Sequence, residues 1–205
     1  MISTILFDFG NVLLELDEQK TMDAFTKILD PKLSTDLNEM AFYPFEKGEI
    51  SEEAFFNRLQ RRSKVVLQGD VYIEAWNSML GSFPLHRISM LRNYRKKFAL
   101  GLLSNTNITH LRFVDRKIKE EHGGLDFRSL FDYCFLSHEI NLRKPEADVY
   151  HYVLSQMNIN PENCLFIDDK SENILAANRL GFKTYLHDPH TEIFDLLPQL
   201  ILSNG

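Results

Sequence analysis

The sequence predicts an α/β fold in which a parallel β-sheet carries helices on both faces and a helical insert interrupts the chain early. Five short apolar runs contain the β-branched and aromatic residues typical of buried strands. The later runs alternate with helical patterns, as they do in parallel sheets. About 90 residues separate the first run from the second, far more than one crossover helix needs.

Each predicted strand is followed by polar or glycine-bearing residues, where a buried strand can turn. The strands are expected at residues 4–9, 98–103, 133–136, 164–167 and 183–186. One helix is expected to begin at Pro145, because proline suits the first position of a helix. Its buried stripe comprises Val149, Val153 and Met157. Another helix follows Asp169 and ends at Gly181.

Residues 16–84 are predicted to be an inserted helical bundle, and residues 1–15 and 85–205 form the core domain. Asp17, Ser51 and Asp70 stand where helix N-caps are expected. The residues expected to face inward are Met22, Phe25 and Leu29 in the first helix, Phe55 and Leu59 in the second, and Ile73, Trp76 and Leu80 in the third, which Gly81 ends. A further helix from Pro84 through Tyr94 leads back to the second strand.

The composition is that of a globular protein rather than a disordered one. The 205 residues are 44% hydrophobic, and 23 basic against 29 acidic residues give a net charge of −6, which disfavours general binding to nucleic acid or membranes. The first apolar stretch contains Asp8 and Gly10, so it is neither a signal peptide nor a membrane span. We expect a cytoplasmic protein, monomeric or weakly homo-oligomeric, whose Cys134 and Cys164 are buried thiols.

Polar residues follow four of the predicted strands, at the edge where parallel sheets bind ligands. They are Asp8-Phe9-Gly10-Asn11-Val12-Leu13, then Ser104-Asn105-Thr106-Asn107, then Arg143-Lys144-Pro145, and finally Asp168-Asp169 with Asn173. Singly, each could be a turn residue, a helix cap or a solvated charge. Two adjacent acids that end an apolar strand are costly unless something pairs them, and a hard divalent cation is a suitable partner.

In their order and placement, these motifs resemble the four signatures of the haloacid dehalogenase-like (HAD) superfamily. The resemblance covers nearly the whole chain and implies a Rossmann-like core with residues 16–84 as a helical cap of the C1 class. Residues 46–51, Glu-Lys-Gly-Glu-Ile-Ser, form a stretch often seen in such caps. Within the superfamily, the motifs look most like the bacterial branch that contains α-D-glucose-1-phosphate phosphatase.

The resemblance implies a magnesium-dependent phosphomonoesterase of small phosphorylated metabolites. Asp8 would be the nucleophile and form an aspartyl-phosphate, which water then hydrolyses. Magnesium would be bound by Asp8, the backbone carbonyl of Gly10 and Asp169. Asp168 would act through a metal-bound water, although the sequence alone leaves open which of these two neighbouring aspartates binds the metal directly.

The same resemblance assigns the groups around the phosphoryl oxygens. Lys144 would pair with Asp8 and with the transferring phosphoryl group. Ser104 and the amide of Asn105 would hold phosphoryl oxygens, and Asn173 would orient the surroundings of the metal.

One position departs from the usual phosphatase pattern. Most phosphatases of the superfamily carry a second aspartate, the general acid and base, two residues after the nucleophile, but this chain has Gly10. General acid catalysis is commonly worth about 10²- to 10⁴-fold, so we expect slow turnover or substrates with good leaving groups. Sugar phosphates are the expected substrates, and aldose 1-phosphates in particular meet that requirement, because a hemiacetal oxygen leaves more readily than an ordinary alcohol. His86 is one candidate proton donor, although a lone histidine near a helix start is more often structural.

Other functions remain to be weighed. A catalytically weak module that binds phospholigands or a partner protein is the alternative, motivated by Gly10. A phosphomutase is disfavoured because it must exchange protons with sugar hydroxyls, and a dehalogenase because it needs no paired magnesium acids. The insert aromatics Phe42, Tyr43, Phe45 and Trp76 are expected to form its core rather than to contact substrate.

Overall fold

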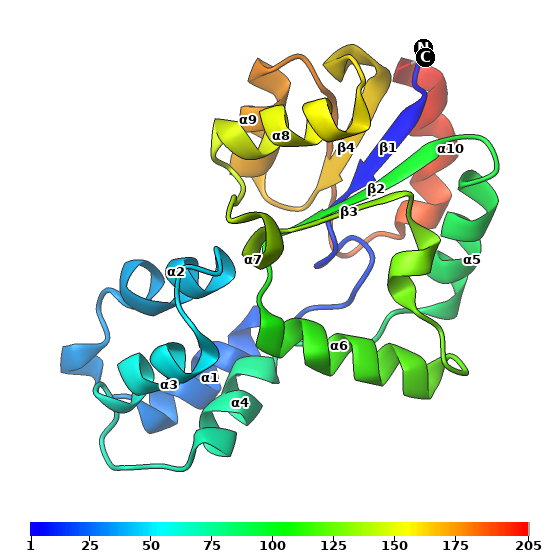
Figure 1. The fold of residues 1–205 in the computed structure, drawn as a ribbon. Coiled ribbons are helices and arrows are strands. Elements are labelled where there is room, and N and C mark those ends of the chain that lie inside the picture. Colours follow the sequence, from blue (N-terminus) through cyan, green and yellow to red (C-terminus); the bar gives the residue numbers. More distant parts are fainter. Residues whose placement is uncertain (205) are drawn as a thin grey trace.

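The computed structural model describes residues 1–204, in which five parallel strands form one sheet in the order β3-β2-β1-β4-β5 (Figure 1). The strands are β1 (Thr4–Phe7), β2 (Ala99–Ser104), β3 (Tyr133–Leu136), β4 (Cys164–Asp168) and β5 (Lys183–Leu186). Strand β1 is central and pairs with β2 on one side and with β4 on the other. The predicted fold class is confirmed.

Three of the strands differ from their predicted bounds by one or two residues. Strand β1 ends two residues early, because the Phe9 carbonyl accepts hydrogen bonds from the N–H groups of Leu13 and Leu14 in a turn. Strand β2 is shifted by one residue and ends on Ser104, and β4 extends to Asp168. Ser104 and Asp168 therefore lie within the strands, and hydrogen bonds of the sheet hold their backbones.

Helices cover both faces of the sheet (Figure 1). Helices α8 (Ala147–Met157) and α9 (Ser171–Arg179) lie on one face, and α5 (Leu85–Tyr94) and α10 (Ile193–Asn204) lie on the other. Helix α6 (Ile108–Glu121) belongs to the α5 side, because its Val114 and Ile118 join the same apolar core. Short elements complete the core domain: α7 (Ser137–Ile140) and the 3-10 turns Phe127–Leu130 and Pro161–Asn163.

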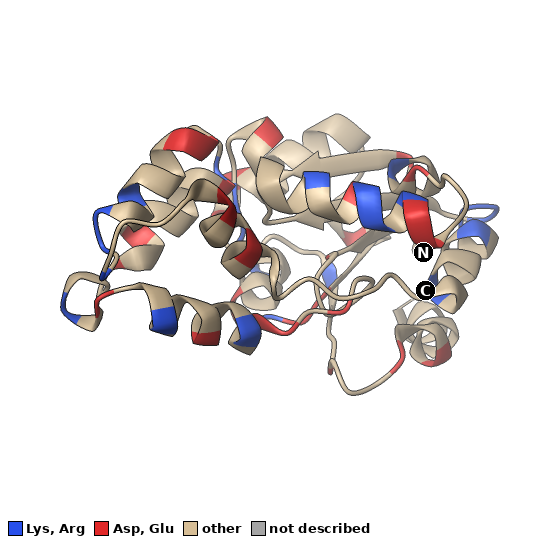
Figure 2. Ribbon diagram, turned by 90° about the horizontal axis from the view of Figure 1, so that it is seen from below, with Lys and Arg blue, Asp and Glu red and all other residues tan. Residues whose placement is uncertain are grey.

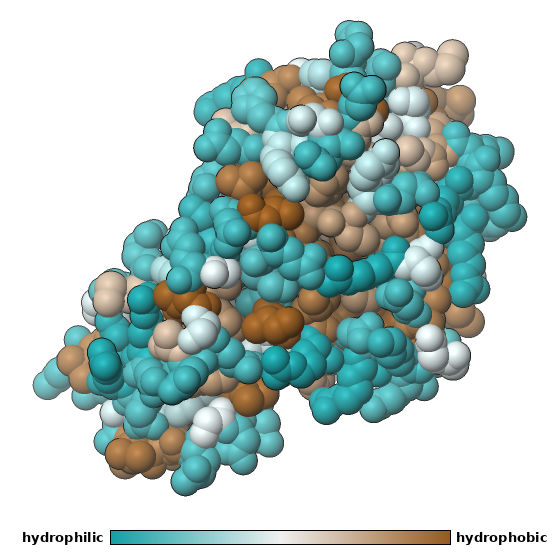
Figure 3. All heavy atoms as spheres, viewed as in Figure 1, coloured by the Kyte–Doolittle hydropathy of each residue, from teal (hydrophilic) through white to brown (hydrophobic). Residues whose placement is uncertain are grey.

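The outer surface carries mixed charges and scattered apolar side chains. Basic and acidic residues are interspersed along the helices (Figure 2), and the face seen in Figure 3 is mainly hydrophilic with isolated hydrophobic spots. No helix within residues 1–204 combines the length and the apolar character needed to cross a bilayer. Both cysteines are free thiols, with Cys164 buried and Cys134 half-buried. The oligomeric state and the cellular location stay predictions.

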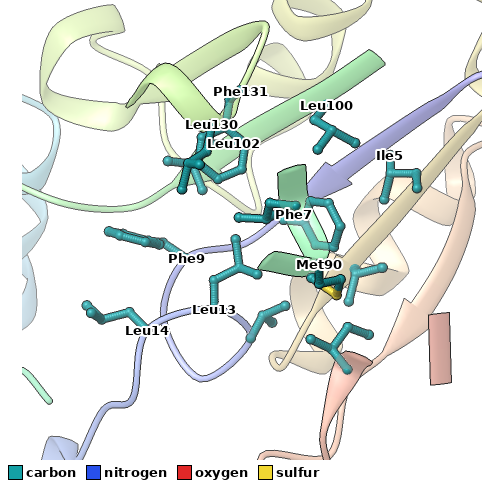
Figure 4. Close-up of a cluster of buried hydrophobic side chains, with 14 of the residues drawn as sticks. Ile5, Phe7, Phe9, Leu13, Leu14, Met90, Leu100, Leu102, Leu130 and Phe131 are labelled. Atoms are coloured by element: carbon teal, nitrogen blue, oxygen red, sulfur yellow. The ribbon is translucent and has the colours of Figure 1, made fainter. Parts of the chain in front are cut away.

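Two hydrophobic cores arise because alternate residues of a strand point to opposite faces. Ile5 and Phe7 of β1 point into the core shared with α5, α6 and α10 (Figure 4). Leu6 lies in the other core, against α8 and α9. The predicted stripe of Val149, Val153 and Met157 is buried there, which confirms the inward face of α8.

The insert between β1 and β2 has a hydrophobic core of its own and lies beyond the carboxyl ends of the strands (Figure 1). It contains α1 (Glu18–Ile28), α2 (Tyr43–Glu46), α3 (Glu52–Gln60), α4 (Gly69–Asn77), a 3-10 turn at Pro31–Leu33 and a π-helical turn at Asn38–Phe42. The chain segments that enter and leave it run side by side, with an antiparallel bridge between Leu16 and Leu80. The domain limits 16–84 stay a prediction.

Two helices do not begin where the sequence predicted. Helix α8 begins at Ala147 rather than at Pro145, because the chain first makes a turn in which the Glu146 N–H donates to the Arg143 carbonyl. Helix α4 begins before Asp70, which therefore lies inside the first turn and does not cap it. That helix ends at Asn77, before Gly81, and it buries Tyr72 more fully than Ile73.

The first insert helix also departs from expectation at two positions. Asp17 precedes α1, but its carboxylate makes no capping hydrogen bond and pairs with Lys20 at 3.5 Å instead. Met22 is 47% exposed rather than inward, while Phe25 and Leu29 are buried as predicted.

Other predicted caps are confirmed. The Ser51 side chain accepts a hydrogen bond from the Ala54 N–H at the start of α3. Helix α5 begins directly after Pro84 and ends at Tyr94. Gly181 follows α9 with a φ of +93°, a conformation that glycine adopts without steric cost.

His110 joins the insert to the core and should make stability depend on pH. Its Nε2 atom lies 3.0 Å from the Trp76 carbonyl of α4, and the two rings stack with centroids 4.6 Å apart. Burial lowers the pKa of His110 from 6.5 to about 4. The unfolded chain therefore takes up this proton more readily, so the stabilisation is complete above pH 6.5 and declines as pH falls toward 4.

We expect the contribution of His110 to the free energy of unfolding, measured with urea between pH 4 and 7, to fall with acid. His110→Gln cannot titrate, so the difference in free energy of unfolding between wild type and variant should shrink as pH falls from 7 to 4. An unchanged slope in His110→Gln would contradict the assignment.

Candidate active site

A cavity of about 310 Å³ is lined by residues at the carboxyl edge of the sheet and by residues of the insert. The core lines it with residues that follow the strands: Asp8, Gly10, Ser104, Asn105, Lys144, Asp169 and Asn173. The structure thus brings together the sequence-predicted site residues. Asp168 does not line the cavity itself, but its carboxylate accepts a hydrogen bond from Lys144, which does. This convergence follows from the parallel sheet, because all its carboxyl ends meet at one edge.

Lys144 is the centre of this group. Its ammonium is 1% exposed, and Nζ lies 2.7 Å from Asp8 Oδ1 and 2.6 Å from Asp168 Oδ2. The backbone of Lys144 is held in turn by the Asn105 side chain, which accepts from its N–H and donates to its carbonyl, each at 2.9 Å. Asn105 therefore has a structural role that the sequence did not predict.

The environment keeps Lys144 charged. Burial alone would lower its pKa, but the carboxylates of Asp168 and Asp8 outweigh burial and raise it. The opposite balance holds at Asp8, where burial, aided by Asp168 and Asp169, raises the pKa to about 7 against the effect of Lys144. The single positive charge of Lys144 cannot balance the carboxylates of Asp8, Asp168 and Asp169, so the group carries an excess of negative charge.

Asp168 has its hydrogen-bonding capacity largely filled by the protein. Besides Lys144, it accepts from the Asn173 amide at 2.9 and 3.0 Å and from the Lys170 N–H at 2.8 Å. Asn173 is itself fixed by Tyr150, whose hydroxyl donates to the Asn173 carbonyl. Asp168 and Asn173 therefore form a buried support for Lys144.

Asp8 and Asp169 keep oxygen atoms that face the cavity without a protein partner. Asp169 Oδ2 accepts from the Asn11 amide at 2.8 Å, but within residues 1–204 neither Asp169 Oδ1 nor Asp8 Oδ2 accepts a hydrogen bond. Oxygen atoms of Asp8, Asp168 and Asp169 lie within 4.8 Å of one another. Free carboxylate oxygens with an excess of negative charge suit a hard divalent cation, so the donor set fits Mg²⁺.

The loop after β1 shapes this donor set. Asn11 has a left-handed backbone with a φ of 57°, and its N–H donates to the Leu14 carbonyl, so its side chain reaches Asp169. The sequence reasoning assigned Asn11 no role. The available signal was an asparagine after a glycine, because asparagine tolerates this conformation better than most residues.

The insert closes the cavity with charged and aromatic side chains. Glu46 at the end of α2 accepts from Arg143 at 3.1 Å, and the Arg143 guanidinium lies 3.8 Å from the centre of the Tyr43 ring. Glu18 pairs with Lys170 at 2.9 Å. No role for Arg143 or Lys170 was predictable from the sequence, because contacts between the insert and the core depend on how the two pack.

Of the four aromatic residues of the insert that were expected to form its core, three line the cavity. Phe45 stacks on Phe55 inside the insert, as expected of a core residue. Phe42 and Trp76 belong to the same core but also line the cavity, as does Tyr43.

His86 is not placed to donate a proton in this cavity. It lies in the first turn of α5, half exposed, and its Nε2 is 2.9 Å from Glu192 Oε2. It does not line the cavity formed by the described residues. The structural interpretation of His86 therefore fits better than that of a proton donor, because α5 packs against α10 and the His86 ring pairs with Glu192.

The sequence is similar to a family of hydrolases and to two curated phosphatases. The sequence family described as haloacid dehalogenase-like hydrolase matches residues 2–181. A D-ribitol-5-phosphate phosphatase of Bacteroides thetaiotaomicron is 29% identical over 90% of this chain and 91% of its own length. A sesquiterpene phosphatase of Aspergillus oryzae is 29% identical over 86% of this chain and 85% of its own.

Solved structures agree with the sequence matches. A HAD family enzyme of Bacteroides thetaiotaomicron, in complex with magnesium and inorganic phosphate, superimposes with a TM-score of 0.82. The two chains are 28% identical, and the superposition covers 96% of this chain and 99% of the other.

The Lys144 ammonium should be worth far more to stability than an exposed ion pair. Lys144→Met leaves buried Asp8 and Asp168 facing each other, so we expect a loss of about 3–5 kcal/mol in the free energy of unfolding. Lys170→Met is the control, because this lysine is 47% exposed in its pair with Glu18 and should cost less than about 1 kcal/mol. Urea denaturation measures both, and equal losses would contradict a central role for Lys144.

Proposed function

The chain belongs to the haloacid dehalogenase-like hydrolase family, and from this membership we propose that it is a magnesium-dependent phosphomonoesterase of small phosphorylated metabolites. One observation carries the proposal: a buried ammonium holds Asp8 at the cavity edge while the neighbouring Asp169 keeps an open oxygen toward the same space. The two relatives named above as phosphatases support the reaction type.

Magnesium, held by Asp8, Asp169 and the Gly10 carbonyl, would neutralise charge between an anionic carboxylate and a phosphate dianion. A cation there also favours the ionised form of Asp8, whose pKa burial otherwise raises. We assign Asp168 to the support of Lys144 rather than to direct metal binding, since its oxygens already accept four hydrogen bonds.

Asp8 is the proposed nucleophile. Its carboxylate attacks phosphorus, the ester P–O bond breaks, and water then hydrolyses the aspartyl-phosphate. Lys144 keeps Asp8 oriented and offers positive charge to the transferring group. The Ser104 hydroxyl and the Asn105 N–H are proposed to hold phosphoryl oxygens, since both residues line the cavity beside Asp8.

Residues 16–84 are proposed to act as a cap that opens to admit substrate and closes over it. The paired segments at Leu16 and Leu80 provide a narrow connection to the core. Closure would exclude bulk water from the carboxylates and strengthen their electrostatic interactions.

Gly10 favours substrates that need little help from an acid. Among sugar phosphates, aldose 1-phosphates are the preferred candidates, because a hemiacetal oxygen leaves more readily than an ordinary alcohol. A D-ribitol 5-phosphate ester, the substrate named for one relative, has an ordinary alcohol as its leaving group. Turnover of 1-phosphates against 5- and 6-phosphates therefore tests this preference.

Phosphate release from a panel of sugar phosphates and other phosphometabolites tests the activity. We expect release in the presence of Mg²⁺ and its loss on addition of a chelator. Asp8→Asn should abolish release, because its amide cannot attack phosphorus, while circular dichroism shows an intact fold. Mass spectrometry of the variant excludes reversion to aspartate.

Two results would contradict this function. Turnover by Asp8→Asn would remove the nucleophile assignment. Failure of the folded wild-type protein to release phosphate from any substrate would favour the alternative, a module that binds phospholigands or a partner without turnover.

Restoring a carboxyl group at position 10 should broaden the accepted leaving groups. A Cβ atom there would press on Leu16 Cδ1, the end of a flexible side chain that can rotate aside. We expect Gly10→Asp to raise kcat for ordinary alkyl phosphates relative to p-nitrophenyl phosphate. Gly10→Asn has the same shape but no proton to give and should not do so; equal effects of the two would contradict the acid-base interpretation.

A further inference from the structure

The cavity contains one half-buried carboxyl group that the reaction above does not use. Glu18 and Glu172 also line it, but the side chain of Glu18 is 53% exposed in its pair with Lys170, and Glu172 is exposed. Asp8 and Asp169 are already assigned to the nucleophile and the metal. Glu46 alone of the cavity-lining carboxyl groups in residues 1–204 is both shielded and unassigned.

Glu46 is held by one contact at its backbone and another at its side chain. It ends α2, and its backbone carbonyl accepts from the Ser137 hydroxyl of α7 at 2.6 Å, which ties this point of the insert to the core. Its Oε2 accepts from Arg143 Nη2 at 3.1 Å. Arg143 is fixed in turn by the Tyr43 ring. Within residues 1–204, Oε1 has no hydrogen-bond partner.

Arg143 and Lys144 are consecutive in the chain and hold two different carboxyl groups. Lys144 binds Asp8, which belongs to the core, and Arg143 binds Glu46, which belongs to the insert. One short turn therefore places the carboxyl group of the insert and the nucleophile around the same cavity.

The surroundings favour proton exchange at Glu46. Burial raises the pKa of its carboxyl group, and the Glu18 carboxylate adds to this, while Arg143 and Lys170 oppose it. A raised pKa makes the protonated acid more available near neutral pH, where a general acid is most effective.

We propose that Glu46 is the proton donor and acceptor that replaces the missing acid at Gly10; the proposal rests on the phosphatase function above. As the Asp8 oxygen bonds to phosphorus, the Glu46 proton passes to the ester oxygen, the P–O bond breaks and the alcohol leaves. The Glu46 carboxylate then takes a proton from the water that attacks phosphorus. The Asp8–phosphorus bond breaks, phosphate leaves, and both groups return to their starting states.

Glu46→Gln tests the proposal through the leaving group. The amide oxygen can still accept from Arg143, so the position of the side chain is preserved. For the alkyl phosphate that the wild type hydrolyses fastest, we expect kcat/KM, which reports the steps up to departure of the alcohol, to fall by about 10²-fold or more. For p-nitrophenyl phosphate, whose leaving group needs no proton, kcat/KM should stay within about threefold, and only kcat falls, because Glu46 also assists the water that hydrolyses the aspartyl-phosphate.

A control and a rescue separate catalysis from structure. Glu49→Gln removes a neighbouring carboxylate that pairs with Lys47 and lies outside the cavity lining, so it should behave as wild type on both substrates. Gly10→Asp, added to Glu46→Gln, should restore turnover of the alkyl phosphate.

The outcomes distinguish this proposal from the function it rests on. If the wild type hydrolyses neither substrate, the phosphatase function fails and this proposal with it. If the wild type is active and Glu46→Gln lowers kcat/KM equally for both substrates, or for neither, Glu46 is not the proton donor. Activity of the wild type on p-nitrophenyl phosphate alone, with no alkyl phosphate turned over, would also overturn the proposal.

Discussion

The buried ion pairs of Lys144 are the constraint on which the rest of the site depends. An ammonium that is 1% exposed is tolerable only if carboxylates surround it, because the cost of desolvating an isolated charge is several kcal/mol. Asp8 and Asp168 meet this need because β1 and β4 are neighbours and end at the same level. Asn105, from the end of β2, fixes the lysine backbone. Three adjacent strands therefore determine where the ammonium lies.

The contact between insert and core has a different character. Its ion pairs join Glu18 to Lys170, Glu46 to Arg143, Lys47 to Glu146 and Glu52 to Arg112, and most of these side chains are partly exposed. Partly exposed pairs are each worth about 0–1 kcal/mol, and the paired segments at Leu16 and Leu80 are short. If the insert opens as the proposed cap, these pairs would cost little to separate, and the buried contact between His110 and the Trp76 carbonyl would be the larger barrier.

In the proposed mechanism, proton transfer depends on the position of the insert. An aspartate at position 10 would belong to the loop after β1, whereas Glu46 belongs to the insert and would leave the cavity whenever the insert opens. The proton donor and the exclusion of water would then be supplied by the same movement. Asp8, Lys144 and Asp168 all belong to the core, so movement of the insert would leave the ion pairs among them unchanged.

The sequence by itself determined the sheet, the helices that cover it, and the set of polar residues at its carboxyl edge. These follow from short-range patterns: apolar runs for strands, helical periodicity, and the fact that parallel strands end at one edge. Only the tertiary structure decided which neighbour of the pair Asp168 and Asp169 supports Lys144, that His86 lies away from the cavity, and that Glu46 meets Arg143. Such contacts join residues far apart in the chain, and the packing of the insert on the core sets them rather than any local propensity.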